Sequence, residues 1–255
     1  MENINQHKKL ILSFYKEVIA NRNTELAKEI IAEDYIQHNP TLKTGISGIL
    51  EAIAFLKQLP DKKVSQSPIK RIICDQNFVA THLLVEMGNT KQLVIDLFRI
   101  QEGKIQEHWD AIESYPGETE RVDNLVDGPS EIRDQYLTQE NKRIVLDFIQ
   151  MVWAKKNLSL LSDFLHPTFI YHHTDVKAGL SGFQQFLAQA GGINVQTIHR
   201  VIGEGNFVLT QLEGSDGERR TVHYQLYHLE GSKISDCWTV SQEFPDKMAH
   251  SNGMI

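Results

Sequence analysis

The sequence has little cysteine and no long apolar run, and both absences exclude classes of protein. Only Cys74 and Cys237 occur among the 255 residues, too few for a disulfide framework or a cysteine-rich zinc module. Such a low cysteine content is typical of a reducing compartment, so we expect a cytoplasmic protein. No stretch of 18 apolar residues is present, so we expect no membrane span.

An excess of basic charge is also missing. The chain has 26 Lys and Arg residues against 33 Asp and Glu residues, a formal net charge of −7. This balance argues against a nucleic-acid partner. The sequence also lacks glycine-rich phosphate loops, helical His pairs at i and i+4, and Cys–His spacings typical of zinc sites. We therefore expect no cofactor and no metal site.

What the sequence does contain is a tandem repeat. Residues 10–53 align with 144–187 at a shift of 134, and residues 69–110 align with 198–239 at a shift of 129. A period of this length is too large for a solenoid, so each copy is expected to be a domain. Identical pairs in the two blocks include Phe14/Phe148, His38/His172, Gly45/Gly179, Arg71/Arg200, Phe78/Phe207 and Trp109/Trp238.

The repeat predicts two domains and a linker. We expect a first domain over residues 1–120, a polar linker with Pro and Gly breakers over 121–137, and a second domain over 138–255. Because the second shift is five residues smaller than the first, the second domain should be shorter after its third helix. Such a chain is expected to form an internal pseudo-dimer, or else a homodimer.

In the first copy, helical patterns come before strand patterns. Apolar residues recur at helical spacing over 11–19 and 26–31. Ser47 is the predicted N-cap of a third helix, which Pro60 ends. Strand patterns follow at 71–73, 78–87, 92–100 and 104–112, and the turn Gln101-Glu102-Gly103 is predicted to join the last two as a hairpin. This order predicts an α+β fold, with helices packed on an antiparallel sheet in each copy.

Two segments carry a resemblance to a known family. They read EDYIQHNP at residues 33–40 and VIDLFRIQEGKIQEHWDAI at residues 94–112. Together with the order of elements, they resemble the SnoaL-like branch of the nuclear transport factor 2-like superfamily. The phrases VDNLVDGP and HSNGMI, which follow the last strand of each copy, look like the tail of single-domain relatives.

The resemblance implies a cone in which a curved antiparallel sheet wraps around a long helix and leaves a pocket at its open end. Enzymes of the family include polyketide cyclases that perform an intramolecular aldol condensation. Related folds carry out ketosteroid isomerisation, dehydration and epoxide opening. The fold also hosts binding modules and adaptors, so the resemblance does not fix an activity.

His108 and Asp110 are the first candidates for catalysis. Strand alternation over 104–112 places both on one face, roughly 7 Å apart at the backbone. In an apolar pocket, such a pair could remove a proton from carbon and return it to oxygen, because burial raises the pKa of a carboxyl group toward the working pH. The resemblance implies that Asp110 is the catalytic acid/base. The alternative is an ordinary solvated strand face.

Two further polar residues lie among apolar neighbours, His82 in FVATHLLVEM and Asp96 in LVIDLFRI. His82 is either a hydrogen-bonded core histidine or a pocket residue that orients the substrate. Asp96 needs a partner if it is buried. That partner is His82 or His108 in the catalytic interpretation, and a backbone or arginine contact in the structural one.

The third group of candidates is expected to bind ligand. His38 recurs as His172, which fits a shared structural hydrogen bond at least as well as ligand binding. Asn39 could bind a substrate oxygen, and Phe98 is expected to contact the ligand. Trp109 and its counterpart Trp238 are expected in the core.

The second copy lacks most of these groups, so its pocket is expected to be degenerate. The replacements are His82 by Gln211, Asp96 by Gln225, His108 by Cys237 and Asp110 by Thr239.

Two functions of different classes are open at this point. The first is a cofactor-independent acid–base enzyme of the polyketide cyclase, aldol condensation or isomerase type, acting on a small apolar ligand that carries a carbonyl group. The second is a non-catalytic module that binds a small hydrophobic molecule or another protein.

Overall fold

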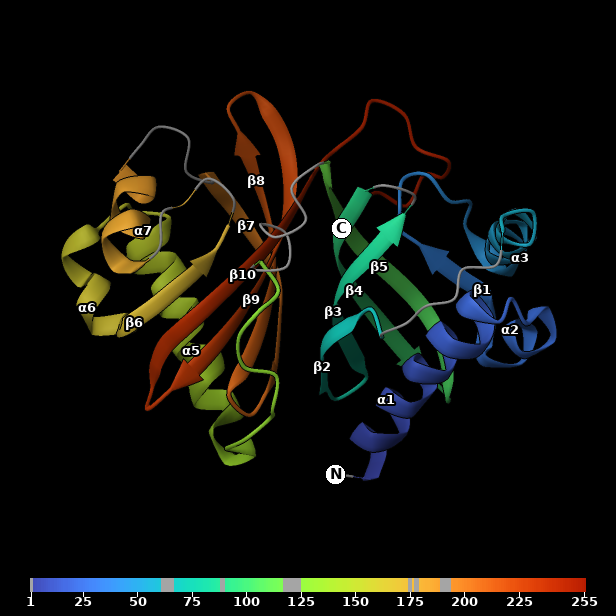
Figure 1. Ribbon diagram of the computed structural model, residues 1–255, viewed down its shortest axis with the longest axis horizontal. Helices are drawn as coiled ribbons and strands as arrows, with labels where there is room; N and C mark the ends of the chain where they lie inside the picture. Colours follow the sequence, from blue (N-terminus) through green and yellow to red (C-terminus); the bar gives the residue numbers. More distant parts are fainter. Residues whose placement is uncertain are drawn as a thin grey trace. The chain divides into compact units, whose positions relative to one another are not determined.

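The protein is described by a computed structural model that covers residues 2–60, 67–87, 90–116, 125–173, 176, 179–188 and 194–255. Each half of the chain consists of helices followed by a five-stranded sheet, which confirms the predicted α+β class (Figure 1). None of the helices in the described ranges is both long and apolar enough to cross a membrane.

The first half begins with a helix whose apolar stripe is buried, as predicted from its spacing. Ile11, Phe14 and Val18 lie in a core with Phe98, Ile100 and Ile105 of the sheet. The elements are α1 (Glu2–Ser13), the π-helical η1 (Phe14–Ala20), α2 (Thr24–Ile30), β1 (Ile31–Gln37), α3 (Gly45–Leu56), β2 (Ile69–Asp75), β3 (Phe78–Met87), β4 (Thr90–Gln101) and β5 (Lys104–Pro116).

The sheet of the first half has the order β1-β5-β4-β3-β2, and it departs from the expected antiparallel sheet at one edge. Strand β1 pairs with β5 in parallel, with Gln37 opposite His108. The chain passes through α3 between β1 and β2, so β1 is not joined to its neighbour by a hairpin and is free to run parallel to it. The sheet is therefore mixed.

The start of α3 also differs from the prediction. The N-cap is Thr44, and Ser47 lies in the first turn instead. Gly45 adopts a positive φ of 78°, which glycine tolerates without strain, so the chain turns into the helix three residues earlier than the pattern indicated.

The predicted hairpin between β4 and β5 is present. Glu102 and Gly103 both have positive φ, 52° and 76°, as the two central residues of a type I′ turn require. Gly231 and Ser232 have the same signs at the matching turn of the second half. The two halves thus build this hairpin in the same way.

The pairing between β1 and β5 has a shift of register. Ile31 lies opposite Ile105, and the next pair is Ile36 with Glu107, so β1 carries the extra residues. On β5, Ile105 belongs to the core, and the ring of His108 stacks on the core residue Phe98.

The second half repeats the architecture with the sheet order β6-β10-β9-β8-β7, and its edge strand β6 is likewise parallel to β10. Its elements are η2 (Gln135–Leu137), α5 (Thr138–Phe148), η3 (Ile149–Trp153), η4 (Leu158–Leu160), α6 (Leu161–Phe164), β6 (Leu165–His172), α7 (Gly179–Ala188), β7 (Asn194–Glu204), β8 (Phe207–Asp216), β9 (Arg219–Glu230) and β10 (Lys233–Glu243).

By their contacts, the residues form two compact units. One unit contains Met1–His82, Ile95–Asp110 and Pro245–Ile255, and the other contains Leu83–Val94 and Ala111–Phe244. The C-terminal segment, which follows the last strand of the second half, therefore belongs to the unit that holds α1, β1 and the centres of β4 and β5.

Candidate active site

A cluster of buried polar side chains lies on the face of the first sheet that the N-terminal helix covers. His108 and Asp110 come from β5 and Asp96 comes from β4, and all three are at most 8% exposed. Strand alternation places the two β5 residues on one face, as the sequence predicted. Tyr15 reaches the same point from η1. The cluster thus combines a helix with two neighbouring strands.

His108 contacts an acceptor through each of its ring nitrogens. Nε2 lies 3.1 Å from Oδ1 of Asp96, and Nδ1 lies 2.9 Å from Oε1 of Gln37. The backbone N–H of Asn39 also donates to Gln37 Oε1, at 2.9 Å, so this atom is the amide oxygen. Both ring nitrogens of His108 therefore donate, as only the imidazolium form can.

The electrostatics agree with a protonated His108. Burial by itself would lower the pKa of the imidazole, but the hydrogen bond and charge of Asp96, and the charge of Asp110, outweigh it. The pKa of His108 is therefore raised above its ordinary value. The ring also stacks on Phe98, with ring centroids 4.6 Å apart, which fixes its plane.

Asp96 is held on both of its oxygens. Oδ1 accepts from His108, and Oδ2 accepts from the hydroxyl of Tyr15. The Tyr15 hydroxyl is also 2.6 Å from Oγ1 of Thr81 on β3. Burial, followed by the charge of Asp96, raises the pKa of Tyr15 well above its ordinary value, so the phenol stays protonated and can act as a donor.

Asp110 is the member of the cluster with unused hydrogen-bonding capacity. Its Oδ2 accepts from Nδ2 of Asn39 at 2.6 Å, whereas its Oδ1 is buried without a hydrogen-bond partner among the described residues. Burial is the main reason that the pKa of Asp110 is raised from 3.8 to about 6, and the charge of His108 opposes it. Near neutral pH, this carboxyl group can both accept and release a proton.

The geometry also bears on metal binding. Asp96, His108 and Asp110 offer ligand atoms that all lie within 4.8 Å of one another, a spacing that a metal ion could use. A metal-bound imidazole must direct a lone pair at the ion. In this cluster both nitrogens of His108 face acceptors, so the hydrogen bonds fit a protonated imidazole and not a ligand.

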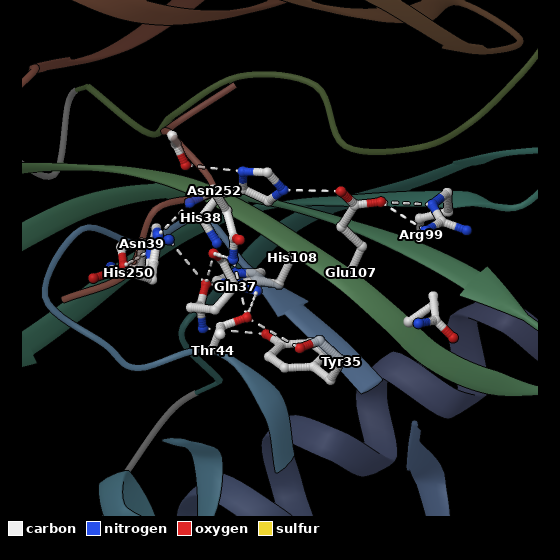
Figure 2. Close-up of polar contacts among 12 residues, drawn as sticks. Tyr35, Gln37, His38, Asn39, Thr44, Arg99, Glu107, His108, His250 and Asn252 are labelled. Carbon is white, nitrogen blue, oxygen red and sulfur yellow. Dashed lines mark hydrogen bonds and ion pairs between the residues drawn. The ribbon is translucent and has the colours of Figure 1, made fainter. Parts of the chain in front are cut away.

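His38 lies in a different set of contacts. Its Nε2 is 2.8 Å from Oε1 of Glu107, whose other oxygen accepts from Arg99. Its ring stacks on Trp109 with centroids 4.8 Å apart. Figure 2 shows the ring of His38 directed at Glu107, with Arg99 on the far side of Glu107. Among the described contacts, His38 reaches neither Asp96 nor Asp110 through a hydrogen bond.

His82 also lies away from the cluster. Thr81 contacts Tyr15, so strand alternation points the next residue, His82, to the opposite face of β3. There its Nδ1 is 3.2 Å from Nη1 of Arg71. The second half has Arg200 bonded to Gln211 at the matching positions, so the pair recurs without the histidine.

Sequence reasoning missed Tyr15 and Gln37, which complete the site. The helical spacing over 11–19 includes Tyr15 only as one member of an apolar stripe, and no pattern in the sequence singles out Gln37. The one available signal is that both become apolar or aromatic in the second copy, where Ile149 and Tyr171 stand, together with the replacement of Asp96 and His108, which they contact.

The second half keeps the geometry around its histidine and loses the polar cluster. His172 lies 3.0 Å from Oδ1 of Asp236 and stacks on Trp238 at 4.7 Å. On the inner face, Cys237 and Thr239 stand in place of His108 and Asp110, and burial raises the pKa of the Cys237 thiol well above its ordinary value. This thiol therefore remains protonated at neutral pH.

Comparison with known proteins agrees with the fold. Residues 9–120 match the family described as SnoaL-like polyketide cyclase. No curated protein matches the chain.

Three solved structures resemble about two fifths of the chain each. They are a SnoaL-like polyketide cyclase from Agrobacterium tumefaciens (15% identity, TM-score 0.35, covering 40% of this chain and 91% of that one), an LEH-like epoxide hydrolase from M. tuberculosis (18%, 0.34, 41% and 84%) and an NTF2-like protein of unknown function from Cytophaga hutchinsonii (17%, 0.36, 45% and 95%).

Proposed function

Since the first half of this chain matches the SnoaL-like family and both halves have the same α+β architecture, we propose that the first half is a cofactor-independent acid–base enzyme. Its substrate class is a small, mostly apolar molecule with a carbonyl group. The observation that carries the proposal is Asp110, a buried carboxyl group with one unpartnered oxygen among the described residues and a pKa of about 6.

Asp110 is the group that moves the proton. Its Oδ1 takes a proton from the carbon next to the carbonyl, and the electron pair of that C–H bond passes to the carbonyl oxygen as an enolate. In an isomerisation, the proton returns to a different carbon. In an aldol reaction, the enolate carbon attacks a second carbonyl, and the proton passes from Asp110 to the new alkoxide oxygen.

His108 and Asp96 support this step without touching the substrate. Both N–H groups of His108 are used by Gln37 and Asp96, so the imidazolium acts through its charge, which lowers the pKa of Asp110 against the effect of burial. Asn39 orients Asp110 through Oδ2 and leaves Oδ1 available. Phe98, 1% exposed, supplies an apolar wall beside the cluster.

For the second half, we propose a non-catalytic role in binding or support. The chain would then carry its own partner copy and behave as an internal pseudo-dimer. The chain has two cysteines, both buried and not joined in a disulfide, which fits the proposed cytoplasmic location. A solution mass equal to one chain is the expected result, and a larger mass would show that pairing within the chain is not sufficient.

The experiment that tests the enzyme does not require the natural substrate. A panel of small apolar ketones with α-hydrogens is incubated with the protein in D₂O, and exchange of the α-hydrogens is followed by NMR. We expect at least one ketone to exchange faster than in buffer, with a rate that rises as Asp110 ionises around pH 6.

Asp110→Asn should reduce this exchange by about 10²–10⁴-fold, the usual contribution of a general base. The matched control in the second half, Thr239→Val, should leave it unchanged. Full exchange by Asp110→Asn would refute the role of Asp110. Saturable ketone binding without exchange in the wild type would favour the binding module.

A further inference from the structure

The C-terminal segment of the chain contacts the corner that follows β1. At this corner the backbone carbonyls of Gln37, Asn39 and Pro40 are all engaged by the segment. Their donors are Nδ2 of Asn252 at 2.9 Å, Nε2 of His250 at 2.9 Å and the backbone N–H of Ala249 at 2.8 Å. Figure 2 shows His250 and Asn252 beside Asn39, Gln37 and His38.

These contacts are tied together within the segment. The backbone N–H of Asn252 donates to Nδ1 of His250 at 3.2 Å, so His250 is neutral and carries its proton on Nε2, the atom that donates to the corner. Nδ2 of Asn252 also donates to Oγ1 of Thr44 at 3.0 Å. The segment therefore bridges the end of β1 and the start of α3.

Two features anchor the segment. Met254 is 1% exposed, so its side chain is buried in the unit that contains the site. Gly253 has a φ of 80°, a conformation that glycine adopts without strain, and its carbonyl accepts from Nδ1 of His38 at 2.9 Å. The segment is thus held by apolar burial as well as by hydrogen bonds.

The corner that the segment holds is also the one that orients the acid–base cluster. The side chain of Gln37 accepts from His108, and the side chain of Asn39 donates to Asp110. A loop that ends a strand is ordinarily more mobile than the strand itself. The backbone contacts from Ala249, His250 and Asn252 limit that motion at the two residues whose side chains touch the catalytic pair.

We propose that the segment Ala249–Met254 positions the acid–base site of the first half, with His250 and Asn252 as positioning residues. The inference rests on the proposed function in one respect, the effect on turnover. The segment belongs to the same compact unit as the site, although it follows β10 along the chain.

The test compares three changes in the full-length chain, His250→Ala, Asn252→Ala and the double variant. Ketone α-hydrogen exchange and the titration of His108, followed by NMR of its ring, are measured for each. A misplaced catalytic group costs up to about 10²-fold in rate, so we expect the double variant to lose about tenfold to 10²-fold in kcat. The titration of His108 should move to lower pH as its contact with Gln37 weakens.

Two control variants separate positioning from general stability. His250→Gln keeps an N–H donor near the position of Nε2 and should restore most of the rate. Ser251→Ala changes an exposed residue of the same segment and should have no effect. Circular dichroism at the assay temperature checks that each variant is folded.

The outcomes for the segment and for the enzyme are distinguishable. A folded double variant with unchanged kcat and unchanged His108 titration would overturn the positioning role. If no ketone exchanges in the wild type, the proposed function fails, and the His108 titration alone still decides whether the segment orients the cluster. If the double variant does not fold, the two single variants decide. Unchanged kcat and unchanged His108 titration in both folded His250→Ala and folded Asn252→Ala would overturn the inference.

Discussion

The two halves of this chain share a backbone plan and differ in what their inner sheet faces carry. Both have a parallel edge strand, an irregular register at the start of the last strand and a hairpin with two positive φ values. Among the described residues, the first half buries Asp96 and Asp110 beside His108, where the second half has Gln225, Thr239 and Cys237. The comparison separates side chains that support the shared fold, the first group, from side chains that we propose for catalysis, the second group.

The histidine at the end of the edge strand belongs to the first group. His38 stacks on Trp109 and bonds to Glu107, and His172 stacks on Trp238 and bonds to Asp236. The arrangement survives in a half that has lost its acid–base groups. It therefore serves to hold the corner between the edge strand and the last strand.

We assign the polar cluster to the second group as part of the proposed function, because the second half replaces its members together. Aromatic rings occupy this region of the second half. The ring centroids of Tyr171 and Phe183 are 5.1 Å apart, and those of Trp153 and Phe183 are 5.4 Å apart. At the positions of these three rings, the first half has smaller or polar residues, in the pairs Gln37/Tyr171, Ile49/Phe183 and Ile19/Trp153. The other exchanged pairs are Tyr15/Ile149, Asp96/Gln225, His108/Cys237 and Asp110/Thr239.

The largest effect is expected from placing a second-half residue in the first half. His108→Cys removes the cation next to Asp110, whose charge lowers the pKa of that carboxyl group. We expect ketone exchange to fall by about 10²-fold or more and the midpoint of the pH–rate profile to move above 6. Cys237→Ala in the second half is the matched control, and an unchanged profile for His108→Cys would contradict the role given to the imidazolium.

The next effect concerns stability and lies in the second half, at His223 on β9. Burial lowers the pKa of this histidine from 6.5 to about 4, so the unfolded chain binds its proton more readily than the folded one. The free energy of unfolding therefore keeps its full value above pH 6.5 and falls by about 3 kcal/mol as the pH drops toward 4.

The first half has Val94 at the position of His223, so His223→Val makes the two halves alike. Urea unfolding between pH 4 and 7 should show a flatter dependence for this variant than for the wild type. His166→Gln, at a half-buried histidine, is the control. Equal slopes for His223→Val and the wild type would show that His223 titrates normally.

Asp110 should destabilise the folded chain when its carboxyl group is ionised. Its pKa is raised from 3.8 to about 6 by burial, so the folded chain holds this proton more tightly than the unfolded one. Stability therefore falls as the pH rises from about 4 to 6, by up to about 3 kcal/mol. Asp110→Asn should be more stable than the wild type at pH 8 while losing activity, and similar to it at pH 4. Lower stability of the variant at both pH values would contradict this account.

The smallest effect is expected at His82. Replacing it by Gln reproduces the Arg200–Gln211 pair of the second half at Arg71. Because the donor–acceptor contact is kept, the free energy of unfolding should change by less than about 1 kcal/mol, and ketone exchange should stay within about twofold. A large loss of exchange in a stable variant would instead indicate that His82 acts on the substrate.

Much of the architecture could be predicted from the sequence, since it depends on local pattern. The repeat is visible as two collinear blocks, and the apolar spacing around Phe14 and Val18 predicts the buried helix face. Strand alternation places His108 and Asp110 together, and turn residues predict the hairpin at Glu102–Gly103. Each of these features is encoded within a few neighbouring residues.

Tertiary structure decided the rest, since these features depend on segments far apart in the chain. Tyr15 and Asp96 are 81 residues apart and share a hydrogen bond, and His38 meets Gly253 across 215 residues. No local pattern reports which acceptor a buried hydroxyl or amide will find. The choice of partner depends on how strands pair and on which polar atoms packing leaves without water, because each buried donor or acceptor must then find its partner within the folded chain.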